Sequence, residues 1–266
     1  MKFSFPLIPN SLCWWATISL DKFLILFYLG EGSNGIYAMT TKFSSIITMI
    51  TSVFILAWQE TSIREYSNKD KHILYSSVFN KFYTLLFSFI IMMLPFIKLV
   101  FRFLIDSSYI EVIKYIPLSF LGTTISAIAS FYGVGYLASG KTRDAFRTTT
   151  YGALINFIFV IIFINKIHLY ANFIATIISF TLVSLRRSTS MKEYFPINVD
   201  KSKILLYISF YVLSVFIYYY FNSIVNLVFL LITILVLIYI NKKEIIFLIR
   251  NGVKNENFKK NIKKYS

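Results

Sequence analysis

The 266-residue chain is too apolar and too sparsely charged for a water-soluble globule, since 57% of its residues are hydrophobic and 15% are charged, against roughly 45–50% and about 25% in soluble domains. At about 20 residues per membrane-spanning helix, its length accommodates about eight spans and leaves no room for a sizeable extramembrane domain. The formal net charge of +15 would indicate nucleic-acid binding in a soluble protein. Here we expect it to reflect membrane topology, with no nucleic-acid partner.

Eight apolar runs long enough to cross a bilayer recur along the chain. They cover residues 8–29, 36–58, 79–100, 116–137, 145–165, 168–185, 204–221 and 224–240. The fifth and sixth runs are joined by so few residues that their boundary is poorly defined. The sequence therefore predicts an all-α polytopic membrane protein of about eight transmembrane helices.

The longest polar connection, at about residues 186–203, separates six expected spans from a final pair. We expect four segments in chain order. They are a six-helix transmembrane bundle over residues 1–187, a cytoplasmic linker over 188–203, a terminal helix pair over 204–241 and a basic cytoplasmic tail over 242–266. The other connections are short, which is typical of antiparallel neighbours.

The 27 Lys and Arg residues are distributed unevenly between alternate connections. With both termini cytoplasmic, the outer side receives only Lys98, Arg102, Lys114 and Lys166. The positive-inside rule thus predicts a multi-pass protein with cytoplasmic termini, surrounded by membrane lipids. The abundance of Phe, Tyr, Ile, Lys and Asn is typical of an AT-rich bacterial genome, so we expect the bacterial inner membrane. The basic tail is expected to be a solvated anchor, with specific lipid or partner binding as the alternative.

Asp21 and Lys22 lie deep in the first expected span, between the apolar stretches CWWATISL and FLILFYL. A charge at that depth is costly unless it is paired or reaches water. Adjacent helical residues point about 100° apart, so we expect each to find its partner on another helix. An interhelical salt bridge and a role toward a substrate or a coupling ion both explain these charges.

The second expected span carries Lys42 within a stripe of hydroxyl residues that share one helix face. The stripe consists of Thr41, Ser44, Ser45, Thr48, Thr51 and Ser52. Such a face either packs closely against another helix or lines a water-filled cavity, and both alternatives stay open. At the cytoplasmic end of this span, we expect an interfacial aromatic belt and a solvated ion pair among Trp58, Gln59, Glu60 and Arg64.

The fourth expected span carries a ridge of small residues that would let another helix approach closely. The ridge consists of Gly122, Ser126, Ser130, Gly133 and Gly135. We expect it to serve helix packing.

Motifs of the common enzyme classes do not occur in the sequence: there is no metalloprotease, nucleophile-elbow, P-loop or dinucleotide-binding signature. Cys13 is the single cysteine, and the two histidines, His72 and His168, lie in connections on opposite expected sides. We therefore expect no metal site and no cofactor, and we do not expect an enzyme.

A series of residues near the start of the chain resembles a pattern of known transporters. It consists of Pro6, Pro9, Asp21, Lys22, Gly30, Gly35, Tyr37 and Lys42, with Pro117, Lys141 and Thr142 downstream. The pattern is similar to that of the bacterial polysaccharide (Wzx-like, O-antigen or capsule) flippases of the multidrug/oligosaccharidyl-lipid/polysaccharide exporter superfamily. Lys22 stands where the family more often has Arg. In family members the pattern opens the second half, so the chain resembles the C-terminal half alone.

The resemblance implies two facing bundles around a central cationic cavity that holds the pyrophosphate of a lipid-linked sugar. It places Asp21, Lys22 and Lys42 as candidate substrate-binding residues in one wall. We expect the chain to act on an undecaprenyl-pyrophosphate-linked oligosaccharide, and only with a separately encoded N-terminal half or a second copy as the other wall. A non-transporting subunit that docks on polysaccharide-synthesis enzymes and half of a multidrug exporter are the alternatives.

Overall fold

The structure, a computed structural model, describes residues 7–104 and 106–240, with side chains from residue 19 onward except 102–104, 107 and 108. Every regular element in this part is a helix. They are α1 (Leu7–Arg64), α2 (Lys71–Leu104), the 3-10 helix η1 (Ser107–Lys114), α3 (Ile116–Ala138), α4 (Thr142–Ile167), α5 (Tyr170–Ser190), α6 (Lys201–Tyr220) and α7 (Ser223–Ile240). The expected basic tail over 242–266 and the side chain of Cys13 lie outside the described residues.

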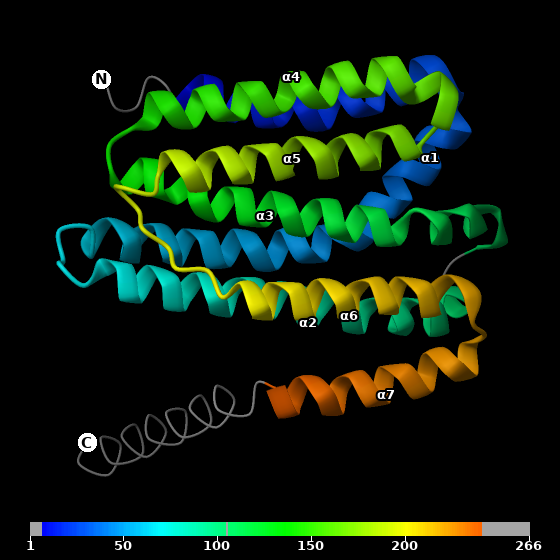
Figure 1. Cartoon of the computed structure of the whole chain (residues 1–266). Coiled ribbons are helices and arrows are strands. Elements are labelled where there is room, and N and C mark those ends of the chain that lie inside the picture. The colour runs from blue at the N-terminus through cyan, green and yellow to red at the C-terminus, as the bar shows by residue number, and fades with distance from the viewer. Residues whose placement is uncertain (1–6, 105, 241–266) are drawn as a thin grey trace, which may run out of the picture.

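Helix α1 contains the first two expected spans in 58 residues. A straight helix of that length would measure about 87 Å, far more than the hydrocarbon thickness of about 30 Å. The helix breaks at Gly30, whose φ of 79° lies in the left-handed region that glycine adopts readily. Figure 1 shows the two parts running in opposite directions from this break. We call residues 7–29 the first arm and residues 31–64 the second arm.

The remaining expected spans correspond to α2 through α7, so the prediction of an all-α polytopic membrane protein is confirmed. Six helices, α1, α2, α3, α4, α6 and α7, are long and apolar enough to cross a membrane. Helix α5 is less apolar and packs against α3 and α4. The poorly defined boundary between the fifth and sixth spans falls at His168, whose φ is 49°.

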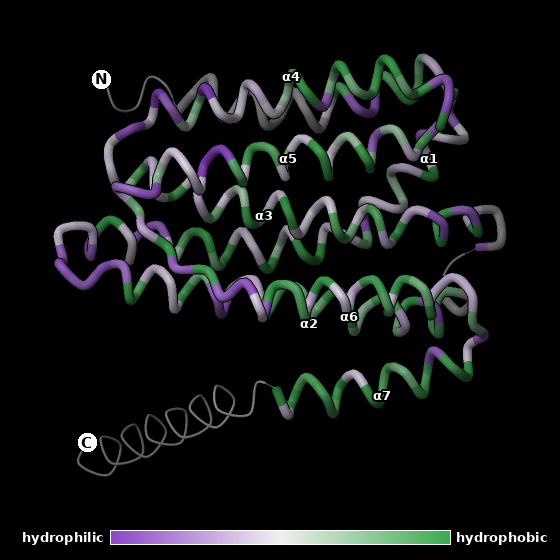
Figure 2. Tube along the Cα trace, viewed as in Figure 1, coloured by the Kyte–Doolittle hydropathy of each residue, from purple (hydrophilic) through white to green (hydrophobic). Residues whose placement is uncertain are grey.

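The connections alternate between the two ends of the molecule (Figure 1). One end, which we call the basic end, carries the connections over 65–70, 139–141 and 191–200, and the opposite end carries the reversal of α1 and η1 (Figure 1). Hydrophilic residues gather at the connections, while the helices between them are mainly hydrophobic (Figure 2). This distribution suits a molecule whose middle lies in hydrocarbon.

The terminal helix pair packs mainly on one earlier helix, α2. Helices α6 and α7 lie mainly against α2, whereas α1, α3, α4 and α5 contact one another. Tyrosines of α6 also bind η1 and the start of α3. The Tyr218 hydroxyl donates to the carbonyl of Ile113 in η1 at 3.0 Å, and the Tyr211 hydroxyl donates to the carbonyl of Pro117 in α3 at 2.6 Å. Pro117 has no N–H, so it cannot donate a hydrogen bond to the carbonyl of Ile113, four residues earlier. Helix α6 therefore supplies the donor that Pro117 cannot offer to η1.

The basic end of α1 is held by an aromatic cluster. Trp58 is only 3% exposed and stacks on Phe131 of α3 at 5.0 Å between ring centroids. Phe195, from the connection between α5 and α6, stacks on Tyr75 at 4.2 Å. The expectation that Trp58 belongs to an interfacial belt is therefore wrong, because its ring is enclosed by other aromatic residues.

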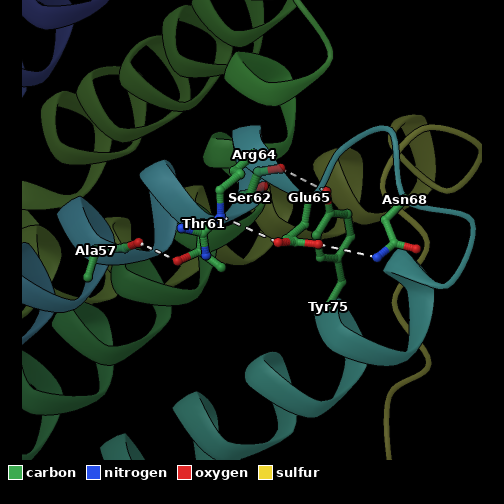
Figure 3. A network of polar contacts seen from close by, with 7 residues as sticks. All are labelled: Ala57, Thr61, Ser62, Arg64, Glu65, Asn68 and Tyr75. Carbon is green, nitrogen blue, oxygen red and sulfur yellow. Dashed lines mark hydrogen bonds and ion pairs between the residues drawn. The ribbon is translucent and has the colours of Figure 1, made fainter.

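A polar network closes the hairpin between α1 and α2 at the same end (Figure 3). Arg64 forms an exposed ion pair with its neighbour Glu65 at 3.4 Å rather than with Glu60, and Asn68 donates to the Glu65 carboxylate at 3.2 Å. The hydroxyl of Tyr75 donates to the carbonyl of Ser62 at 3.0 Å. This network provides hydrogen-bond partners for carbonyl oxygens and charged groups at the helix end, which would otherwise bond to water.

Candidate functional site

A cavity of about 840 Å³ lies between the second arm of α1, α3 and α5. We call it the hydroxyl cavity because eleven Ser and Thr residues line it. They are Thr41, Ser44, Ser45, Thr48, Thr51 and Ser52 of α1, Ser119, Thr123, Ser126 and Ser130 of α3, and Thr176 of α5. The stripe on the second expected span thus lines a cavity, and part of the small-residue ridge on α3 faces it.

One pair of these hydroxyls also joins two helices. The oxygens of Ser44 and Ser119 lie 2.8 Å apart and share a hydrogen bond between α1 and α3. The two alternatives for the stripe, packing and cavity lining, are therefore both realised on one helix face.

Most of the hydroxyls donate their hydrogen to a carbonyl of their own helix. Such bonds run from Thr41 to Tyr37, Ser45 to Lys42, Ser52 to Met49, Ser126 to Thr123, Ser130 to Ser126 and Thr176 to Asn172, at 2.6 to 3.0 Å. A hydroxyl has one hydrogen to donate and two lone pairs that accept. The cavity wall therefore offers mainly acceptors to whatever enters it.

Asp21 on the first arm also lines the cavity and is 4% exposed. The Tyr37 hydroxyl donates to its Oδ2 at 3.2 Å, and Nδ2 of Asn172 donates to its Oδ1 at 3.2 Å. Asn156, in the amide orientation that satisfies both its polar atoms, donates to the same Oδ1 at 3.3 Å. Because Tyr37 follows Asp21 by sixteen residues, the reversal at Gly30 is what brings the two together.

The partners of Asp21 are all uncharged, so among the described residues no salt bridge explains its burial. Oδ1 of Asn172, next to it, is buried without a hydrogen-bond partner. A carboxylate at membrane depth with neutral partners can take up a proton or hold a monovalent cation. The described residues contain no group of three or more His, Cys, Asp or Glu side chains that could hold a metal ion.

Lys22 and Lys42, the two cationic candidates, are exposed and do not line the hydroxyl cavity. Lys22 follows Asp21 directly, and the turn of about 100° per helical residue directs the two side chains differently. Lys42 lies beside Thr41 and near Ser45, which do line the cavity. Of the three candidate residues, only Asp21 lies at the cavity wall.

Sequence reasoning missed the partners of Asp21 and one buried cation. Asn156 and Asn172 are polar residues in apolar runs, a signal that could have marked them. Arg187 of α5 was expected among the cytoplasmic positive charges, but it is 3% exposed and forms hydrogen bonds with α3 and α4. Its position next to Arg186 at a helix end gave no indication of burial.

Compared with known proteins, the chain matches no family model, no curated protein and no solved structure. The resemblance to polysaccharide flippases therefore stays a prediction based on its own residues.

Proposed function

We propose that this chain is a transporter-type protein of the bacterial cytoplasmic membrane that forms one wall of a polysaccharide flippase. Its substrate would be a lipid-linked oligosaccharide moved outward across the membrane, with the basic end and both termini in the cytoplasm. The observation that supports this best is the hydroxyl cavity, a space of about 840 Å³ between α1, α3 and α5 that is lined by eleven Ser and Thr residues.

The chemistry of the cavity wall favours a ligand that donates hydrogen bonds. Sugar hydroxyls are such donors, and the wall offers hydroxyl oxygens whose own hydrogens are bound within their helices. A phosphate group carries only acceptors at neutral pH, and the described wall contains no Lys or Arg. We therefore assign the glycan, rather than the pyrophosphate, to the hydroxyl cavity.

The pyrophosphate would lie outside this cavity, near exposed cations. Lys42 is the better candidate because it neighbours the cavity residue Thr41, and Lys22 is the second. A separately encoded N-terminal half or a second copy of the chain would complete the enclosure, since one bundle supplies one wall. Asp21 would couple transport to a proton or cation by changing its charge state.

Reconstitution tests this proposal directly. The full chain, alone and together with a candidate N-terminal half from an adjacent reading frame, is placed in vesicles with a fluorescent undecaprenyl-pyrophosphate-linked sugar. We expect translocation only with the second wall or in a dimer. Robust translocation by the monomeric chain would contradict the two-wall proposal, and no translocation in any combination would favour a non-transporting subunit.

A matched pair of variants links the activity to the cavity. Ser126→Leu places an apolar side chain in the hydroxyl cavity, whereas Ser209→Leu places the same side chain on an exposed position of α6 outside it. We expect transport to be lost in the first variant and kept in the second. Equal loss in both would indicate impaired folding, which size-exclusion profiles would reveal.

Export of a cationic drug is the second candidate, because the one charged residue in the described cavity wall is Asp21. A buried carboxylate attracts a ligand with a cationic group, and the substrate of a flippase has no such group. A competition experiment with a lipophilic cation such as ethidium separates the two functions. If the chain is an exporter, ethidium binds in an Asp21-dependent manner. If it is a flippase, ethidium leaves the binding of the lipid-linked sugar unaffected.

A further inference from the structure

Two prolines remove backbone hydrogen bonds in the half of the molecule opposite to the basic end (Figure 1). Pro95 lies inside α2 and has no N–H, so the carbonyl of Ile91, four residues earlier, loses its helical donor. Pro117, at the start of α3, leaves the carbonyl of Ile113 in η1 in the same situation. A carbonyl without a donor is costly in hydrocarbon, and helices bend most readily at proline. Each of these two places therefore needs a donor from another element to stay fixed.

One face of α6 supplies both donors. The Ser214 hydroxyl donates to the carbonyl of Ile91 at 3.1 Å, and the Tyr218 hydroxyl donates to the carbonyl of Ile113 at 3.0 Å. Ser214 and Tyr218 are four residues apart and therefore lie one above the other on the helix. Both side chains are fully buried. A single helix thus holds two proline-weakened points that belong to two different elements.

The chain between the two prolines forms a corner at this end of the molecule. We call residues 96–104 and 106–116, which comprise the end of α2 and η1, the proline corner. Its η1 part contacts α1, where a Cβ added to Gly35 would lie 3.9 Å from the side chain of Tyr109. Leu118 and Ser119, directly beyond Pro117, line the hydroxyl cavity. A movement of the proline corner would therefore change the shape of that cavity.

The start of α3 has room to move. Pro117 and Leu118 line a second cavity, of about 850 Å³, between α2, α3, α5 and α6. Leu118 lies between the two cavities, since it lines both of them. A shift of this residue toward the second cavity would widen the hydroxyl cavity without a clash against packed side chains.

We propose that α6 is a clamp that controls the width of the hydroxyl cavity at the end where η1 lies. While Ser214 and Tyr218 hold the carbonyls of Ile91 and Ile113, the proline corner keeps its place. When both bonds break, α2 bends at Pro95, the start of α3 shifts, and the cavity widens. This device goes beyond the proposed function and does not depend on it, because it acts on the cavity whatever ligand enters.

Hydrogen exchange of the full chain in phosphatidylcholine nanodiscs tests the clamp. The double variant Ser214→Ala/Tyr218→Phe removes both donors. The matched control is Ser209→Ala/Tyr220→Phe, because Ser209 donates to its own helix and Tyr220 is 76% exposed. We expect amide exchange in the proline corner to become about tenfold faster in the first variant and to stay unchanged in the control. No change in the first variant, or an equal increase at the basic end, would overturn the proposal.

A cysteine in the hydroxyl cavity reports its width. Thr123→Cys lies in the cavity wall, and Cys13→Ser removes the single native cysteine. We expect a water-soluble maleimide to label Thr123→Cys several-fold faster when Ser214→Ala/Tyr218→Phe is added, and at the original rate with the control pair. Faster exchange in the corner with unchanged labelling would overturn the link between the clamp and the cavity.

Restoring the missing N–H separates the clamp from a general packing role of Ser214. Pro95→Ala gives α2 its own donor for the carbonyl of Ile91. In this background we expect Ser214→Ala to leave exchange in the proline corner unchanged, whereas in the original chain Ser214→Ala alone speeds it up. An equal effect of Ser214→Ala in both backgrounds would overturn the proposal, since the bond to Ile91 would not be what holds the corner.

Discussion

Asp21 and Arg187 are the two charged side chains most deeply buried in the described helices, and they behave differently. Asp21 is 4% and Arg187 3% exposed, and neither has an oppositely charged partner among the described residues. Both are costly in a membrane. What distinguishes them is their surroundings, because Asp21 lines the hydroxyl cavity and Arg187 does not.

The guanidinium of Arg187 donates hydrogen bonds to two neighbouring helices, α3 and α4. Its Nε donates to Oγ1 of Thr148 at 3.0 Å, Nη1 to the carbonyl of Ala129 at 2.7 Å, and Nη2 to Oγ1 of Thr149 at 2.8 Å. It lines neither cavity. Because guanidinium groups stay protonated in proteins, this charge is fixed and serves to hold α3, α4 and α5 together.

Asp21, by contrast, lies at the edge of a cavity and beside a buried amide oxygen, Oδ1 of Asn172, that has no partner. Its carboxylate can be neutralised by a proton or a cation that arrives through the cavity. We infer from the difference that a buried charge in a membrane protein can change its charge state where a cavity adjoins it, and is structural where it is packed between helices away from a cavity.

The largest expected effect comes from Asp21→Asn, which removes the charge and keeps the size of the side chain. Tyr37 can still donate to the amide oxygen, so we expect folding and membrane insertion to persist and coupled transport to be abolished. The measurement is the initial translocation rate in vesicles, with thermal unfolding as the control. Normal transport would mean that Asp21, like Arg187, is structural.

In contrast to Asp21→Asn, Arg187→Ala should lower the stability of the fold. It leaves a cavity and several buried acceptors without donors, so we expect a loss of about 3 kcal/mol in the free energy of unfolding. The exposed neighbour Arg186→Ala is the matched control and should change stability little. Chemical denaturation in detergent measures both. A stable Arg187→Ala protein that fails to transport would assign Arg187 to function.

Asp21 and Arg187 also show which features of the structure can be predicted from the sequence. Asp21 could be predicted because a carboxylate inside an apolar run has few explanations, and the hydroxyl stripe could be predicted from its helical spacing. Arg187 could not, since its burial depends on Thr148 and Thr149 of α4 and on space beside α3. Likewise, the spans follow from hydropathy, but the packing of α6 and α7 on α2 depends on contacts that no local pattern encodes.

Gly133→Ala tests how closely α3 fits around Arg187. A Cβ at this position would lie 2.9 Å from Nη1 of Arg187, too close for the guanidinium to keep its place. We expect a loss of about 1–2 kcal/mol in the free energy of unfolding. Gly32→Ala is the control, because nothing lies within 4 Å of its added Cβ and alanine favours the helix. If both variants are equally stable, Arg187 has more freedom than its hydrogen bonds indicate.

The smallest effect is expected for Lys22→Ala, although Lys22 adjoins Asp21 in the sequence. The side chain is exposed and lines neither cavity, so its removal changes no contact of the carboxylate. We expect the translocation rate to stay within about twofold of the original. Lys42→Ala, beside Thr41 at the cavity wall, should reduce it more. A stronger effect at Lys22 would place a phosphate contact on the first arm and would mean that the second wall of the transporter covers it.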